Sequence, residues 1–138
     1  MAESAVRGGS GGETEPEVRT ADEGDVVSLT LEGELTDTAR RPLVRVLTEA
    51  LLSGKPLRRI ELHLGGVPFM NSAGMAVLVQ LQRMAAPRGV EVALVTPSPA
   101  VARPLQLSGL WLRFPILDEN GDEDEDAPGL PPAGERDS

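Results

Sequence analysis

The order of hydrophobic patterns in the middle of the chain most limits the folds open to it. In the stretch VVSLTLE, Val27, Leu29 and Leu31 alternate with polar residues, which is the period of a half-buried strand. RRIELHL, around Ile60, and GVEVALV, around Val92, are two further strand candidates. Segments with the period of a helix separate these strands. Strand–helix–strand units of this length predict parallel strands joined by right-handed crossovers.

Three segments have helical spacing. The first is expected to begin near Arg41 and to end at Gly54. Its candidate caps are Thr36, Asp37 and Thr38. The second helix is expected from about residue 72 to 86. The third is expected between the cap candidate Ser98 and a glycine stop at Gly109.

The sequence therefore predicts an α/β fold with one domain, in which helices pack on a mixed sheet of four to five strands. We place this domain at residues 25–117. Residues 1–24 are interpreted as a flexible, Gly-rich and acidic leader that contains a weak strand candidate at 16–21, and residues 118–138 as an acidic disordered tail. The net charge of −9 comes from these two ends, because residues 25–117 hold seven acidic and ten basic side chains.

The side chains needed for catalysis or metal binding are scarce. The chain has no cysteine and no tyrosine, and His63 is its one histidine, which argues against a metal site. Phosphate-binding glycine motifs are absent, and the three aromatic residues stand in apolar contexts that offer nucleic acid no platform. The carboxylates of Glu34 and Asp37 suit helix capping better than acid–base catalysis. We expect a protein that is not an enzyme and that has no cofactor, no metal and no nucleic-acid partner.

The sequence also bears on where the protein acts. No apolar stretch approaches the length of a membrane span, and the first residues lack the pattern of a signal peptide. We therefore expect a cytoplasmic protein without membrane insertion.

One short stretch, Asn71-Ser72-Ala73-Gly74, stands where an apolar run stops and the second helix begins. A helix N-terminus leaves backbone N–H groups unpaired and favours negative charge. Asn71 or Ser72 can accept one of these N–H groups, and the small Ala73 and Gly74 allow another chain to approach closely. On these grounds both simple capping and a surface for a protein partner remain open.

Four blocks in this order resemble the STAS domain of the anti-sigma factor antagonist family. They are Gly33 to Leu35, Phe69 to Met75, Pro97 to Val101, and Leu105 to Leu110. The resemblance covers about Asp25 to Leu117. It implies a mixed sheet with helices, and a partner surface around the helix that starts at Asn71. It also implies that the partner is an anti-sigma factor of the serine-kinase type. Members of the family regulate transcription by displacing the sigma factor from that partner, and phosphorylation by the kinase releases them.

The chain departs from the family motif at the residue that normally carries the phosphate. The usual motif is Asp-Ser-Ser/Thr-Gly, with the phosphate on the second hydroxyl residue, and here Asn71, Ser72, Ala73 and Gly74 take its place. Ala73 has no hydroxyl, so only Ser72 could carry a phosphate in this motif. The resemblance thus implies an antagonist whose usual phosphoserine switch is lost or displaced. His63 is a second departure, since the family commonly has an acidic or amide residue there.

The expected partner-binding residues lie on this helix start and on the turn before the first helix. They are Glu34, Thr36, Asp37, Asn71, Ser72, Ala73, Gly74 and Met75. Met75 is equally compatible with packing in the core. Three alternatives stay open: an unphosphorylated STAS subunit of a larger signalling scaffold or lipid-transport complex, a sensor of a small ligand, and a hydrolase centred on Ser72.

Overall fold

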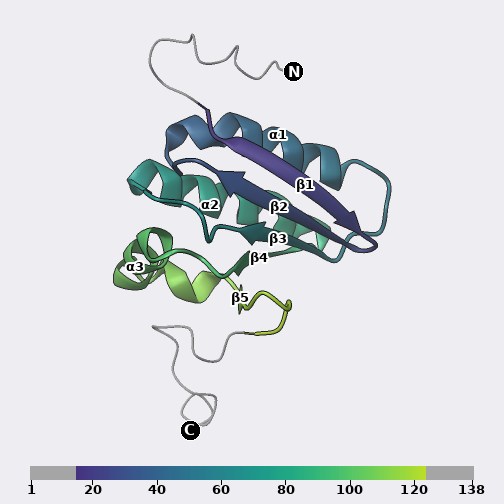
Figure 1. Ribbon diagram of the computed structural model, residues 1–138. Helices are drawn as coiled ribbons and strands as arrows, with labels where there is room; N and C mark the ends of the chain where they lie inside the picture. The colour runs from purple at the N-terminus through teal and green to yellow at the C-terminus, as the bar shows by residue number, and fades with distance from the viewer. Residues whose placement is uncertain (1–14, 124–138) are drawn as a thin grey trace, which may run out of the picture.

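The computed structural model describes residues 15–123 and shows a five-stranded sheet with three α-helices (Figure 1). The strands are β1 (Glu17–Glu23), β2 (Val26–Glu32), β3 (Arg59–His63), β4 (Glu91–Val95) and β5 (Ile116–Leu117). The α-helices are α1 (Arg40–Leu51), α2 (Ser72–Ala85) and α3 (Pro99–Ser108). Short 3-10 helices are η2 (Asp37–Ala39), η3 (Ala86–Arg88) and η4 (Leu110–Arg113).

The strands lie side by side in the same order as in the sequence, from β1 to β5. β1 is antiparallel to β2, and the other three pairs are parallel, so the sheet is mixed as expected. Each parallel connection advances by one strand in the same direction, and right-handed crossovers therefore place the connecting helices on one face. In Figure 1, α1 and α2 lie behind the sheet. The prediction of a single α/β domain with a mixed sheet is confirmed.

The core fills the space between this covered face and the helices. The strand register aligns Leu29, Leu62 and Leu94 across β2, β3 and β4, and each of them is at most 1% exposed. Leu47 of α1 and Leu81 of α2 belong to the same buried cluster. Burial of large side chains of this kind contributes about 1.5–3 kcal/mol each relative to exposure. The alternation seen in the sequence is therefore the alternation between core and outer face.

The outer face of the sheet carries more polar side chains. His63 lies there, half-buried, with its Nε2 atom 3.8 Å from Oε1 of Glu61. Both residues take the outward side that their alternation with leucine and isoleucine predicts. Ala93, Val95 and Leu117 form a small separate buried cluster on this face.

β1 is longer than its sequence suggests. A weak strand was expected only at 16–21 within a leader, whereas β1 runs from Glu17 to Glu23 and pairs with β2 along its whole length. Six of its seven residues are exposed, and Val18 alone packs against the core. Hydrophobic alternation therefore cannot mark this strand, because an exposed edge strand buries few side chains. Residues 1–14 of the expected leader lie outside the described residues.

The first residues of the expected acidic tail follow β5 as an ordered turn. The Oδ1 atom of Asp118 accepts hydrogen bonds from the N–H groups of Asn120 (2.9 Å) and Asp122 (3.0 Å). Leu117 and Glu123 form an antiparallel bridge that closes this turn. Residues 124–138, on which most of the expectation of disorder falls, lie outside the described residues.

Some helix ends follow the local signals and others do not. Thr36 caps η2 and not α1, whose N-cap Ala39 makes no side-chain hydrogen bond. α1 ends at Leu51, three residues before the expected stop at Gly54. α1 begins within one residue of the expected Arg41, and Gly109 stops α3 with a φ of +82°. Ser98 precedes α3 as expected, but its side chain makes no cap hydrogen bond. Its hydroxyl donates instead to the carbonyl oxygen of Val67 at 2.6 Å. The expected side-chain cap is therefore wrong, because a tertiary acceptor competes for the same hydroxyl.

Candidate functional site

The start of α2 is capped by Asn71. Its backbone is extended, and its Oδ1 atom accepts a hydrogen bond from the N–H of Gly74 at 2.9 Å. Such a cap satisfies one of the N–H groups that a helix leaves unpaired. Ser72, the first residue of the helix, is exposed, and Ala73 is half-buried. Of the two expected cap candidates, Asn71 takes the role and Ser72 remains at the surface.

The turn between β2 and α1 packs directly against this helix start. Leu35 donates its N–H to the carbonyl oxygen of Phe69 at 2.9 Å, and its own carbonyl accepts the N–H of Asn71 at 3.4 Å. Leu35 also forms a parallel bridge with Met70. The two segments that the sequence suggests as partner-binding are therefore joined into one unit by their backbones.

Gly74 is the residue that allows this contact. A Cβ atom at Gly74 would lie 1.9 Å from the carbonyl oxygen of Leu35 and 2.7 Å from its carbonyl carbon. Both distances are too short for any side chain. Gly74 is buried, so the close approach expected from another chain is made by this chain's own turn. Its absent side chain serves the internal geometry of the site.

The remaining expected residues divide between the surface and the interior of this unit. Glu34 and Asp37 are exposed on the turn. Thr36 is half-buried, and its Oγ1 atom accepts the N–H of Thr38 at 3.2 Å, which caps η2. Met75 is half-buried against the core, with its Sδ atom 4.0 Å from the hydroxyl of Ser108.

The exposed side chains of the unit define what we call the docking surface. It consists of Glu34, Asp37, Asn71 and Ser72. These residues come from two segments, the turn after β2 and the start of α2. Their side chains expose two carboxylates, one amide and one hydroxyl.

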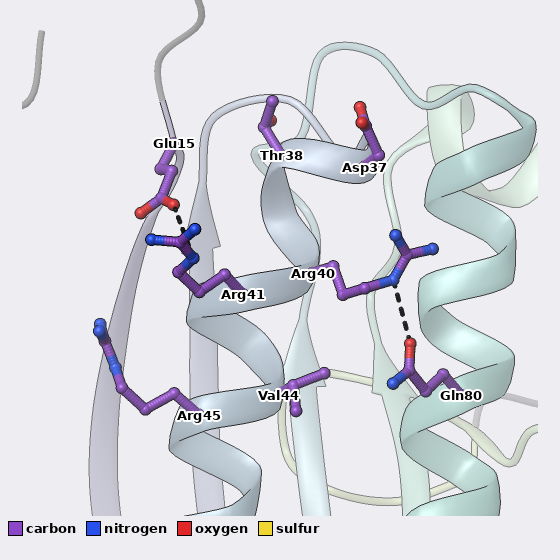
Figure 2. Close-up of a pocket in the computed structure, with 8 residues that line it drawn as sticks. All are labelled: Glu15, Asp37, Thr38, Arg40, Arg41, Val44, Arg45 and Gln80. Carbon is purple, nitrogen blue, oxygen red and sulfur yellow. Dashed lines mark hydrogen bonds and ion pairs between the residues drawn. The ribbon is translucent and has the colours of Figure 1, made fainter. Parts of the chain in front are cut away.

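A hollow over the first turns of α1 adjoins the docking surface. It has a volume of about 680 Å³ and is open to solvent. Its lining residues are Glu15, Asp37, Thr38, Arg40, Arg41, Val44, Arg45 and Gln80. Figure 2 shows Arg41 and Arg45 extending on the side of Glu15, and Arg40 extending toward Gln80 of α2. We call this hollow the arginine groove.

Sequence analysis did not single out these arginines. The signal was present, because residues four apart lie on the same side of a helix, and Arg41 and Arg45 have that spacing. It was overlooked because exposed arginines on an amphipathic helix are common and need no function. Only the fold places Arg40, Arg41 and Arg45 around one hollow.

The polar side chains that the structure describes outside the docking surface and the arginine groove do not form a metal site. A second hollow of about 460 Å³ opens at the carboxyl ends of β2 and β3, and His63 and Thr96 are among its lining residues. Within residues 15–123, no three histidine or acidic side chains come together as a metal site would require. In the same part of the chain, no helix is both long and apolar enough to cross a membrane.

Comparison with known proteins places this geometry in a family. The STAS domain family model matches residues 17–121. An anti-sigma F factor antagonist of Paenibacillus polymyxa is 31% identical over 93 residues, which cover 67% of this chain and 79% of the relative. The chain belongs to the STAS-domain, anti-sigma factor antagonist family. The resemblance found in the four sequence blocks is confirmed, and the family match begins at the first residue of β1.

Solved structures of other STAS-like proteins share the fold. A Thermotoga maritima protein superposes with a TM-score of 0.64 at 28% identity, covering 73% of this chain and 86% of that chain. The anti-sigma factor antagonist SpoIIAA in its unphosphorylated form gives a TM-score of 0.58 at 24% identity, with 74% of this chain and 87% of that chain covered. SpoIIAA in its phosphorylated form gives 0.56 at 23% identity, with 74% and 90% covered. At such identities the SpoIIAA structures show the common fold alone.

Proposed function

We propose that this STAS protein is an anti-sigma factor antagonist that binds a serine-kinase-type anti-sigma factor and lacks the usual phosphoserine switch. The observation that carries the proposal is the helix start of α2, which exposes Asn71 and Ser72 but has Ala73 at the position that the resemblance assigns to the phosphate. Binding and switching are separate properties in this proposal. The first depends on the docking surface and the second on a hydroxyl that is missing.

The docking surface is well suited to binding because it is already formed in the free protein. Its two segments are fixed by the hydrogen bonds of Leu35 and by the Asn71 cap, so little conformational entropy is lost when a partner binds. The Paenibacillus relative, which is an anti-sigma F factor antagonist by name, supports an anti-sigma factor as the partner. We expect contacts through Glu34, Asp37, Asn71 and Ser72, with Thr36, Ala73, Gly74 and Met75 supporting them from within.

Loss of the switch follows from the chemistry of Ala73. A phosphate adds about −1.5 to −2 charges at neutral pH and would repel a partner that presents carboxylates. Ala73 has no oxygen to receive a phosphoryl group, so it cannot be the site of release. Ser72 carries the one hydroxyl within the motif and is exposed. We therefore propose that the protein stays bound to its partner unless Ser72 has taken over the switch.

The proposed role needs no catalytic group and no cofactor in this chain. An antagonist acts by occupying a surface of the anti-sigma factor, and the kinase supplies whatever chemistry follows. Since its target regulates transcription, we propose a cytoplasmic location.

The test begins with the tagged protein purified from its native host, with bound proteins and the intact mass of the bait measured together. We expect a kinase-type anti-sigma factor bound to unphosphorylated bait. A transporter or scaffold partner would favour the structural alternative, in which phosphorylation was never needed. A phosphorylated bait whose label survives Ser72→Ala would contradict the loss or displacement of the switch.

The docking surface is tested with the purified partner. Ser72→Arg places a long cation on the exposed start of α2, and we expect it to weaken binding at least tenfold, as truncation or blocking of central interface residues often does. Ser53→Arg, the same substitution at an exposed position after α1, is the matched control. Far-ultraviolet circular dichroism checks that both variants fold. Equal affinity of the two variants would place the partner elsewhere on the molecule.

A further inference from the structure

The arginine groove holds more positive charge than the described residues neutralise. Arg41 has one carboxylate near it, with its Nε atom 3.8 Å from Oε2 of Glu15. Arg40 donates from Nε to the neutral side chain of Gln80 at 3.1 Å, and the terminal nitrogens of its guanidinium group are left for another acceptor. Among residues 15–123, no carboxylate lies within ion-pair distance of Arg45, and Asp37 pairs with none of the three arginines.

Arginines of β1 and of the loop before β3 are placed differently. Arg19 lies 2.7 Å from Glu32, and Arg58 lies 3.0 Å from Asp25. In contrast to Arg19 and Arg58, Arg40 and Arg45 of α1 have no carboxylate partner among the described residues. A guanidinium group can hold a carboxylate through two parallel hydrogen bonds, and three of them on one helix form a surface that favours acidic chains.

The described part of the acidic run after β5 lies far from the groove. The structure ends at Glu123, which is paired with Leu117 at the β5 edge, whereas the groove lies beside β1 at the opposite edge. Four strand spacings separate these edges by about 19 Å. The side chains of residues 1–14 carry a net charge of only −1, from Glu3, Glu13 and Arg7.

The position of the groove indicates an occupant that is also bound to the docking surface. Asp37 belongs to both, and Gln80 lies on α2 two turns beyond its start. A partner seated on the start of α2 therefore extends over Arg40 and the first turns of α1.

We propose that the arginine groove receives an acidic segment of the partner protein, and that Arg40, Arg41 and Arg45 are a second part of its binding site. The proposal rests on the proposed function for the identity of that partner, but its chemistry can be tested alone. Exposed charges of this kind accelerate association more than they slow dissociation, and salt screens them over about 10 Å at 0.1 M.

The first experiment uses a fluorescein-labelled octaglutamate peptide and the full-length protein. We expect the peptide to bind the wild-type protein and to lose about tenfold in affinity on the double charge reversal Arg41→Glu with Arg45→Glu. Arg103→Glu, an exposed position on α3, is the matched control and should bind as the wild type does. Equal peptide binding by the double variant and the control would overturn the groove, whatever the partner proves to be.

The second experiment measures association of the purified anti-sigma factor with the same variants at two salt concentrations. We expect the double reversal to slow association about tenfold at low salt, with a smaller difference at high salt. If wild-type protein and double variant associate equally while Ser72→Arg still weakens binding, the docking surface stands and the groove is overturned. If the wild type binds the peptide but no anti-sigma factor, the proposed function fails while the acidic preference of the groove remains.

Deletion of residues 124–138 is the remaining control. Unchanged association after this deletion is expected if the groove is free for a partner. Faster association that disappears in the double reversal would mean that this chain's own acidic end occupies the groove, and would overturn the assignment to a partner.

Discussion

Gly74 of α2 packs directly against the carbonyl oxygen of Leu35. A Cβ atom at Gly74 would lie only 1.9 Å from that oxygen. The same carbonyl accepts the N–H of Asn71. Leu35 itself is 0% exposed. The turn that contains Leu35 is thereby held against the N-terminus of α2. The exposed residues of these two segments form the docking surface.

Gly74→Ala should destabilise the fold strongly. The added methyl group meets backbone atoms that cannot move without breaking the hydrogen bonds of Leu35, and we expect the free energy of unfolding to fall by about 3 kcal/mol, the upper part of the range for overpacking. Urea denaturation measures the change. Gly66→Ala is the control, because no atom lies within 4 Å of a Cβ there and its φ is not positive. Equal urea midpoints for the two variants would show that the backbone at Leu35 can move to accommodate a methyl group at little cost.

Asn71→Ala should remove the cap of α2. Loss of the hydrogen bond from the N–H of Gly74 is expected to cost about 1 kcal/mol of stability. Asn71→Asp keeps an acceptor at the same place and adds a negative charge that the helix N-terminus favours, so its stability should equal or exceed that of the wild type. Thermal unfolding of the three proteins checks the order. An aspartate variant as unstable as the alanine variant would contradict the capping role.

Ala73→Ser should restore a phosphate acceptor. With the purified anti-sigma kinase and ATP, we expect one phosphoryl group on this variant and weaker binding after its transfer, because the added charge is placed within the partner contact. Intact mass and binding are measured on the same sample. Ala73→Gly, which adds no hydroxyl, is the control. If the Ala73→Ser variant binds the kinase but is not phosphorylated, the start of α2 does not reach the ATP bound to the kinase.

Removal of residues 1–24 should lower the stability of the domain, although the sequence predicts that these residues are a flexible leader. It deletes β1, breaks the ladder with β2 and leaves a central strand as an exposed edge. We expect a loss of about 3 kcal/mol or more, since each backbone hydrogen bond contributes about 0.5–1.5 kcal/mol net. Denaturation and size-exclusion chromatography measure stability and self-association. A protein lacking only residues 1–14 is the control, and equal stability of the two truncations would contradict a structural role for β1.

The difference at β1 shows what hydrophobic pattern detects. β2 and β3 were evident because their apolar side chains alternate with polar ones, and β4 because it is a short, nearly continuous apolar run. β1 contributes Val18 alone, so its strand conformation comes from pairing with β2 and not from its own side chains. The strand conformation of β1 is therefore set by its position beside β2.

The candidate site divides in the same way. The sequence by itself narrowed the cap of α2 to Asn71 or Ser72 and showed that Ala73 has no hydroxyl, whereas the structure assigned the cap to Asn71 and placed Ser72 at the surface. The sequence also suggested the Gly33–Asp37 turn, but only through resemblance to a family. It gave no physical reason for that turn to meet the start of α2.

Residue types and their spacing by themselves determined the helices and the three inner strands, and they narrowed the cap of α2 to two residues. Each depends on neighbours a few positions away, through helical and strand periods and local hydrogen bonds. Only the tertiary structure decided that Leu35 lies on Gly74, that β1 completes the sheet, and that the arginines of α1 flank the docking surface. Such relationships depend on which faces of the elements pack together, and that is set by the burial of the whole core.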